Sequence, residues 1–292
     1  MNLRDLEYLV AVADQGHFGR AAEACNISQP TLSMQIKKLE TNLNVQVFER
    51  GNKSVRVTRI GELILIHARA ALREAKEIRR IARSHQDPWS TELTLGIFPT
   101  LAPYLLPRIV PEIMKTYPNL KLRLVEDRTP NLIERLSNGD LDMAILALPV
   151  AGDHLMSKKL FTENFELAVP NKDPLASRTS VSQLDLANRS VMLLEDGHCL
   201  RDQALEICTL VGGRENQEFR GTSLETLRQM VSAGMGVTIM PELAVQPTSG
   251  ITYVPFADNP APSRTIGLTW RKDSGEDVRA EKIGGIIAAE AE

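Results

Sequence analysis

The chain has 292 residues, of which 43% are hydrophobic, and a formal net charge of −3. This length predicts two or more domains with a substantial core, and the composition excludes a disordered chain. No segment approaches the roughly 18 to 20 uninterrupted apolar residues of a membrane span. Residues 1–5 are polar and lack the apolar block of a signal peptide, so we expect a cytoplasmic protein without a membrane partner.

The charge is spread unevenly. Residues 1–87 hold 14 Lys+Arg and 10 Asp+Glu, a net of +4, and the remainder holds 20 and 27, a net of −7. A basic N-terminal part on an acidic body indicates an N-terminal module that binds a polyanion. Three cysteines in a cytoplasmic chain argue against a structural disulfide framework, so any disulfide here is expected to be transient and functional.

The N-terminal pattern predicts three short helices. Apolar residues at helical spacing mark the first helix over residues 6–13, and residues 18–25 form the second. After a tight break, the third helix covers residues 28–40. Ser28 is a good N-cap for this helix, and Pro30 lies in its first turn, where its missing N–H costs nothing.

The third helix has one apolar face and one polar face. Leu32, Ile36 and Leu39 are spaced four and three residues apart and are expected to point inward. A helix, a short turn and a second helix that carries polar hydrogen-bonding side chains form a helix-turn-helix, whose second helix enters the major groove of double-stranded DNA. The residues of this helix predicted to bind DNA are Ser28, Gln29, Pro30, Thr31, Ser33, Met34, Gln35 and Lys38. The competing interpretation is a small helical domain that binds protein.

A β-hairpin is predicted to follow as a wing. Residues 45–48 and 55–57 have strand character and flank the turn residues 51–53. Arg50, Lys53 and Arg56 near the tip suit contacts to phosphate or to the minor groove. Residues 1–58 are therefore predicted to form a winged helix-turn-helix domain.

Residues 59–84 are predicted to form one long helix. Its apolar residues alternate steps of four and three, which is the seam of a helix pair between two chains. These residues are Ile64, Ala68, Ala71, Ala75, Ile78 and Ala82. The alternative is a helix that lies on its own domain. The sequence at 85–88 breaks the helix, so residues 59–87 are interpreted as a linker and dimerisation helix.

Residues 88–292 alternate strand and helix signals. Strands are predicted at 93–97, 120–125, 141–148, 165–169, 191–194 and 237–240, and helices at 104–116 and 130–138. This βαβ periodicity predicts an α/β domain with a largely parallel sheet, which binds ligands at the carboxyl ends of its strands. Around two hundred residues are enough for two lobes with a cleft between them.

Two cysteines, Cys199 and Cys208, lie in one predicted helix. Nine residues at about 1.5 Å rise place their α-carbons roughly 13 Å apart. A disulfide requires about 7 Å or less. Either these thiols never pair, or pairing breaks the helix and forces a change of fold, as in a redox switch.

The two thiols are expected to differ. Asp196 is placed to cap the helix, so Cys199 lies in its first turn, where the helix dipole favours a thiolate and His198 and Arg201 add donors or positive charge. Cys208 is expected to be an ordinary buried thiol that resolves a sulfenic acid on Cys199. Zinc binding by His198 and the two cysteines is disfavoured because no CxxC pair and no fourth ligand is present, and no metal or cofactor is predicted.

The N-terminal module resembles the LysR-type transcriptional regulators. The resemblance lies in residues 21–22, 28–33, 36–40 with Leu43, and 48–50. It implies an effector domain similar to periplasmic binding proteins, and residues 139–142 resemble a strand entry of that domain.

The rest of the chain resembles, more narrowly, the hydrogen-peroxide-sensing members of that family. The matching segments are residues 99–100, 104–107, 195–204, 222–228 and 264–268. The resemblance implies that Cys199 is the peroxidatic cysteine and Cys208 the resolving one, linked by a reversible disulfide. The peroxide-binding residues it implies are Thr100, Thr129, His198, Asp202 and Arg264.

By themselves, the two threonines are more typical of turn or cap residues after a strand. The resemblance also implies a homodimer or homotetramer that binds promoter DNA and RNA polymerase in the bacterial cytoplasm and controls antioxidant genes. Two alternatives remain: a LysR-type regulator of an organic metabolite with inert cysteines, and a thiol peroxidase. A DNA-binding module and a dimer helix argue against an enzyme.

Overall fold

The structure is a computed structural model that describes residues 1–50, 55–84, 87–272 and 274–291. The chain forms two compact units, Met1–Gln86 and Asp87–Glu292. The first has a single hydrophobic core, whereas the second contains two.

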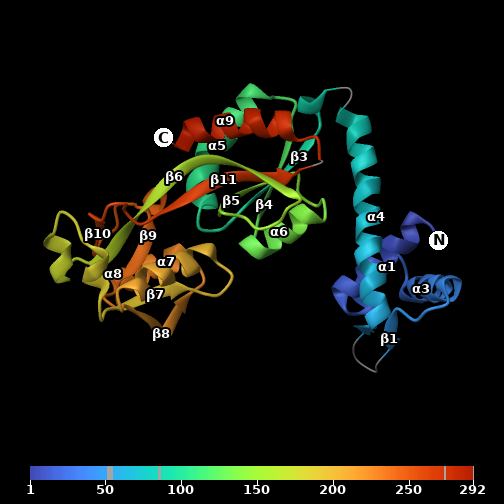
Figure 1. The fold of residues 1–292 in the computed structure, drawn as a ribbon, viewed down its shortest axis with the longest axis horizontal. Coiled ribbons are helices and arrows are strands. Elements are labelled where there is room, and N and C mark those ends of the chain that lie inside the picture. The colour runs from blue at the N-terminus through green and yellow to red at the C-terminus, as the bar shows by residue number, and fades with distance from the viewer. Residues whose placement is uncertain (51–54, 85–86, 273, 292) are drawn as a thin grey trace. The chain divides into compact units, whose positions relative to one another are not determined.

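Four helices build the first unit: α1 (Leu3–Gln15), α2 (Phe18–Ala24), α3 (Gln29–Leu43) and α4 (Arg59–Ser84) (Figure 1). Ser28 is the N-cap of α3, and its Oγ accepts a hydrogen bond from the Thr31 N–H at 3.3 Å. Pro30 lies in the first turn. Leu32, Ile36 and Leu39 are buried in the core of this unit, as the apolar spacing predicted. Local capping and periodicity therefore decide this helix.

The wing consists of β1 (Phe48–Arg50) and the antiparallel β2 (Val55–Val57). The strand predicted at 45–48 is wrong for its first three residues. A Glu40 oxygen accepts hydrogen bonds from the Val47 and Phe48 N–H groups at 2.8 and 3.1 Å. The backbone ahead of β1 is thus held by a side chain of α3 rather than by a neighbouring strand. The predicted turn residues 51–53 lie outside the described residues.

The long helix α4 has the bounds that the sequence predicted. Part of the predicted apolar seam packs within its own unit: Ala68 is 3% exposed and belongs to the core that includes α1, and Ile64 and Ala71 pack against that core. The alternative interpretation, a helix lying on its own domain, holds for this part. Farther along, Ile78 is 69% exposed. An apolar groove of about 560 Å³ runs beside the first turns of α4 and includes Leu63 and Ile64 in its lining.

The second unit begins with β3 (Glu92–Ile97), α5 (Ala102–Thr116), β4 (Lys121–Glu126), α6 (Thr129–Ser137), β5 (Met143–Leu148) and β6 (Leu155–Pro170). It continues with β7 (Ser190–Leu194), α7 (Cys199–Leu210), β8 (Arg214–Gly221), α8 (Leu224–Ser232) and β9 (Thr238–Pro241). The 3-10 turn η4 (Glu242–Ala244), β10 (Ile251–Pro255), β11 (Ser263–Arg271) and α9 (Asp277–Ala291) complete it.

The prediction of a largely parallel sheet is wrong. The large sheet has the order β10-β6-β11-β5-β3-β4, with β9 also paired to β6. Within it β3 runs parallel to β4 and β5, whereas β11 is antiparallel to β5 and β6, and β6 is antiparallel to β9 and β10. Alternating strand and helix signals predict parallel strands joined by helical crossovers. They do not reveal that a later strand, β11, inserts antiparallel between β5 and β6.

Two long strands, β6 and β11, connect two lobes of this unit (Figure 1). Residues 155–164 of β6 pair with β11, and residues 165–170 pair with β9 and β10. Lobe I has a core built on β3, β5, α5, α6 and α9, and lobe II has a separate core built on β7, α7, α8 and β9.

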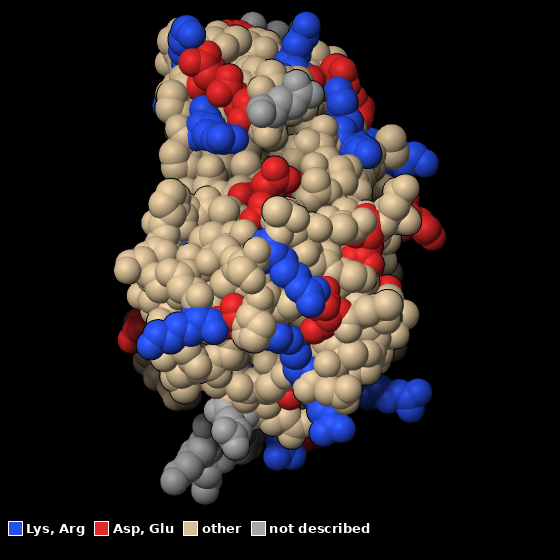
Figure 2. Space-filling model, turned by 90° about the vertical axis from the view of Figure 1, so that its left-hand side faces the viewer, with Lys and Arg blue, Asp and Glu red and all other residues tan. Residues whose placement is uncertain are grey.

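Among the described residues, no helix is both long and apolar enough to cross a membrane. Figure 2 shows basic and acidic side chains interspersed on the face that it presents, with no large patch of one sign. The net negative charge of the second unit is therefore not gathered on that face.

Candidate functional site

Helix α7 carries both cysteines of interest, one at its first residue and one in its last turn. Its N-cap is His198, whose side chain makes no capping hydrogen bond. The prediction that Asp196 caps this helix is wrong, because the Asp196 carboxylate pairs instead with Arg201, with Oδ1 3.2 Å from Nε. The side chain that could have capped the helix binds a cation one turn further on.

The two thiols belong to different cores. Cys199 packs against the core of lobe I, whereas Cys208 is fully buried in the core of lobe II, together with Leu200, Ala204 and Ile207 of the same helix. Both cysteines are free. A bond between them therefore requires Cys199 to leave one core, in addition to the loss of helix between the two positions.

Two polar side chains from distant segments, Arg264 and Thr129, act on the Cys199 thiol, and a third, Thr100, is bound to Arg264. Arg264 of β11 is 2% exposed, and its Nη1 and Nη2 donate to the Oγ1 and carbonyl oxygen of Thr100 at 3.0 and 3.2 Å. Thr129 is the first residue of α6, and its buried hydroxyl has no partner of ordinary hydrogen-bond geometry among the described residues. It lies close enough to the thiol to lower its pKa. The structure thus places Thr129 and Arg264 close to Cys199, and Thr100 is held by Arg264.

Burial raises the pKa of the Cys199 thiol above its ordinary value. The positive charge of Arg264, the Thr129 hydroxyl and the Leu200 N–H each lower this pKa, but their sum is smaller than the effect of burial. The direction of this shift is opposite to the one expected at the start of a helix, although the Leu200 N–H in the first turn acts in the expected sense. Burial of the thiol thus opposes the polar groups that favour the thiolate.

His198 lies at the edge of a cleft. This cleft has a volume of about 620 Å³ and is bordered by Thr100 and Tyr104 of lobe I and by Ser223 and Arg228 of lobe II, among others. Burial, and then the charge of Arg128, lower the pKa of His198. The lowered pKa favours the neutral imidazole, so of the two expected roles, donor or positive charge, the structure favours the donor.

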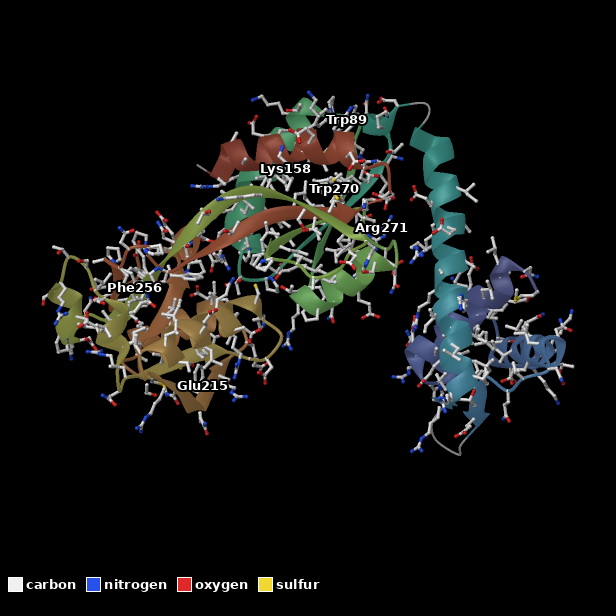
Figure 3. The ribbon with its side chains drawn as sticks, viewed as in Figure 1. Trp89, Lys158, Glu215, Phe256, Trp270 and Arg271 are labelled. Carbon is white, nitrogen blue, oxygen red and sulfur yellow. The ribbon has the colours of Figure 1, made fainter. Side chains whose placement is uncertain are left out.

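Two further predicted neighbours of Cys199 point elsewhere. The Asp202 side chain is 80% exposed on α7, and its charge raises the pKa of Cys199 rather than completing a buried pocket. Arg201 is almost buried, and its Nη2 donates to both Glu215 oxygens at 3.0 and 3.1 Å. Glu215 is the second residue of β8 (Figure 3). This pair ties the first turn of α7 to β8.

The polar face of α3 is available to a partner. The side chains of Thr31, Met34 and Lys38 are exposed, and those of Ser33 and Gln35 are half-buried. Ser28, Gln29 and Pro30 are exposed at the start of the helix. The helix thus presents a contiguous set of hydrogen-bonding side chains on the face opposite its buried apolar residues.

Of the predicted wing residues, Arg56 is exposed on β2. The side chain of Arg50 and the whole of Lys53 lie outside the described residues. Within the described part of the chain, no three histidine, cysteine or acidic residues are grouped as a metal site would require.

Sequence reasoning missed two residues of this region. The Arg128 guanidinium binds the Glu195 carboxylate at 3.1 Å and the Asp196 carbonyl oxygen at 3.0 Å, which fastens the loop before Cys199 to the start of α6. Glu163 of β6 is 3% exposed and holds Arg264. Neither contact has a sequence signal, because each joins residues more than 60 positions apart.

Comparison with known proteins matches both units. Residues 3–62 match the bacterial regulatory helix-turn-helix proteins of the lysR family, and residues 86–291 match the LysR substrate binding domain. The chain is 45% identical over 292 residues to the DNA-binding transcriptional dual regulator OxyR of Escherichia coli (strain K12), covering 99% of this chain and 95% of the relative. The chain belongs to the LysR family, among the OxyR proteins.

Other OxyR proteins agree. The hydrogen peroxide-inducible genes activator of Haemophilus influenzae is 42% identical over 99% of this chain and 97% of its own. Full-length OxyR of Pseudomonas aeruginosa, a cysteine-to-aspartate variant, aligns with a TM-score of 0.76 at 36% identity over 98% of this chain and 94% of that one. A hydrogen-peroxide-bound mutant of Corynebacterium glutamicum OxyR aligns at 0.65 and 33%, over 99% and 94%. The predicted fold class and LysR relationship are confirmed.

Proposed function

We propose that this OxyR-family chain is a DNA-binding transcriptional regulator that senses hydrogen peroxide through oxidation of Cys199 and a reversible Cys199–Cys208 disulfide. One observation carries the proposal. Cys199 packs against one core close to Thr129 and to Arg264, which binds Thr100, whereas Cys208 on the same helix is buried in another core. Formation of the disulfide after oxidation of Cys199 therefore requires a change of fold around α7.

The first chemical step is a nucleophilic displacement. The Cys199 sulfur, after losing its proton, attacks one peroxide oxygen; an S–O bond forms, the O–O bond breaks, and the other oxygen leaves as hydroxide, which takes up a proton to become water. A thiolate of high pKa is intrinsically the better nucleophile. The threonine hydroxyls and Arg264 stabilise the negative charge that develops on the departing oxygen, so the pocket assists the reaction without a low thiol pKa.

The second step forms the disulfide. The Cys208 sulfur attacks the Cys199 sulfur; the S–S bond forms, the S–O bond breaks, and a second water leaves, so one peroxide takes two electrons from the two thiols. Burial raises the pKa of Cys208 to about 11. This thiol therefore becomes a competent nucleophile once its segment has opened to water.

The DNA-binding part of the proposal uses α3 and the wing. Thr31, Ser33, Gln35 and Lys38 face the major groove, and Arg56 contacts the backbone. Two chains pair through the exposed part of α4 to present two such helices, and two pairs form a tetramer. The rearrangement of α7 changes the spacing of the DNA-binding domains on promoter DNA. This spacing in turn controls the recruitment of RNA polymerase in the bacterial cytoplasm.

The two alternatives predict different thiol chemistry. A regulator of an organic metabolite has inert cysteines, and a thiol peroxidase turns over many peroxides per chain with a thiol donor. The relatives above are regulators of transcription, which disfavours an enzyme. The cleft of about 620 Å³ has room for a metabolite. A regulator of a metabolite, however, gives no role to two cysteines that lie on one helix but in different cores.

The test is a stoichiometric pulse of peroxide on the reduced, full-length protein, followed by mass spectrometry. A Cys199–Cys208 linkage is expected in the parent chain. In Cys208→Ser a dione probe should trap a sulfenic acid on Cys199, and Cys199→Ser should form neither product. Cys25→Ser is the matched control and should behave as the parent. A Cys199 that reacts no faster than free cysteine would overturn the assignment.

A further inference from the structure

Glu163 occupies the point at which the two long strands pass from one lobe to the other. Its α-carbon is opposite that of Arg264, where β6 pairs with β11, and two residues later β6 pairs with β9 instead. The side chain of Glu163 is almost completely buried. A charged group in such a place requires full hydrogen bonding to be tolerated.

The two oxygens of Glu163 have different partners. Oε2 accepts a hydrogen bond from Arg264 Nε at 2.6 Å. Oε1 accepts one from the Leu243 N–H at 2.9 Å, in η4, which follows β9. Both partners are donors, so both oxygens must act as acceptors, which a carboxylate can do and an amide cannot.

These contacts fix the direction of the Arg264 guanidinium. With Nε bound to Glu163, its Nη1 and Nη2 face Thr100 and donate to the Oγ1 and to the carbonyl oxygen. Because the Thr100 Oγ1 already accepts a hydrogen bond, its own O–H is directed to another acceptor. Thr100 also lines the cleft of about 620 Å³.

We propose that Glu163 is a positioning residue for the oxidation of Cys199, holding Arg264 so that the Thr100 hydroxyl donates to the peroxide. The proposal rests on the proposed function, since it concerns the same reaction. Glu163 touches neither the thiol nor the peroxide and acts through Arg264. Its second oxygen is bound by η4, where Leu243 packs against the core of lobe I and Ala244 is buried in the core of lobe II.

The experiment compares two reactions of Cys199 in full-length protein that carries Cys208→Ser and Cys25→Ser. Rate constants are measured at one pH for hydrogen peroxide and for iodoacetamide, and their ratio cancels the fraction of thiolate. Glu163→Gln should lower this ratio about 10- to 100-fold, the size expected when one positioning contact in a reactive site is lost. Glu166→Gln neutralises another carboxylate of β6 and should leave the ratio unchanged.

A double-mutant cycle separates positioning from general loosening of the fold. If Glu163 acts through Arg264, adding Glu163→Gln to Arg264→Gln should lower the ratio no further. Two results would overturn the inference. In the first, the two substitutions lower the ratio of the peroxide rate constant to the iodoacetamide rate constant independently, so that their effects multiply. In the second, this ratio in Glu163→Gln stays within about twofold of the parent value. If Glu163→Gln does not fold, Glu163→Asp replaces it in the same cycle. Aspartate keeps the negative charge, but its shorter side chain cannot reach Arg264 in the same geometry.

Failure of this inference is distinguishable from failure of the proposed function. If the proposed function is wrong, Cys199 of the parent protein reacts with peroxide no faster than free cysteine. If only the role of Glu163 is wrong, the parent protein reacts fast and the Glu163→Gln variant reacts equally fast.

Discussion

Replacing Glu215 by Gln should make the disulfide form faster by weakening the contact that holds the first turn of α7. In the reduced fold, Arg201 donates to both oxygens of Glu215, with side chains 9% and 13% exposed. The Arg201 side chain must leave this partner if residues 199–208 are to unwind. The ion pair therefore opposes the switch and favours the reduced fold.

The size of the effect follows from the burial. A hydrogen bond to a charged group contributes about 1.5 to 3 kcal/mol when its partners are largely buried. The second partner of Arg201, Asp196, has a 77% exposed side chain and compensates little. A loss of about 1 to 3 kcal/mol corresponds to a roughly 5- to 150-fold larger population of the opened segment.

Two measurements read out this population. At saturating peroxide, the step from sulfenic acid to disulfide should accelerate by the same factor, as long as opening limits it. Hydrogen exchange of the reduced protein should show correspondingly less protection over residues 199–208. Glu206→Gln is the matched control, because Glu206 is exposed on the same helix and neutralising it should change neither quantity.

Two results would refute this reasoning. If Glu215→Gln forms the disulfide at the parent rate although exchange over residues 199–208 has increased, opening of this helix does not limit the switch. If the disulfide forms while the helical amides stay protected throughout, the helix does not unwind at all, and the fold must bring the thiols together in another way.

Three further predictions concern the dimer, the DNA and the pH. Ile78→Lys should split the dimer in sedimentation, because a charge would then face its own copy across an apolar contact, and a variant that stays dimeric places the interface elsewhere. Gln35→Ala should change base preference in a footprint, whereas Arg56→Ala should weaken all sites alike and lower the salt slope by about one; unchanged affinities count against this face. Burial raises the pKa of Cys208 from 9.0 to about 11, so the unfolded chain releases this proton first, and the free energy of unfolding should fall between these pH values by at most roughly 2 to 3 kcal/mol. Cys208→Ser should flatten that part of the urea-unfolding pH profile, and an identical profile would contradict the burial effect.

The sequence by itself determined the elements whose causes are local. The Ser28 cap, the first-turn Pro30 and the apolar spacing after them lead to α3, and the uninterrupted pattern over residues 59–84 gives α4 its observed bounds. The placement of Cys199 and Cys208 on one helix is of the same kind. Each depends on hydrogen bonds and side-chain spacing within a few turns of chain, which a single sequence displays.

Only the tertiary structure decided how these elements are used. The assignment of Cys199 and Cys208 to different cores, the antiparallel return of β11, and the burial that raises the pKa of Cys199 all depend on segments far apart in the chain. Arg264 meets Glu163 across 101 residues and Thr100 across 164. Such contacts arise from the packing of whole strands and helices, and no spacing within the sequence encodes which side chains that packing brings together.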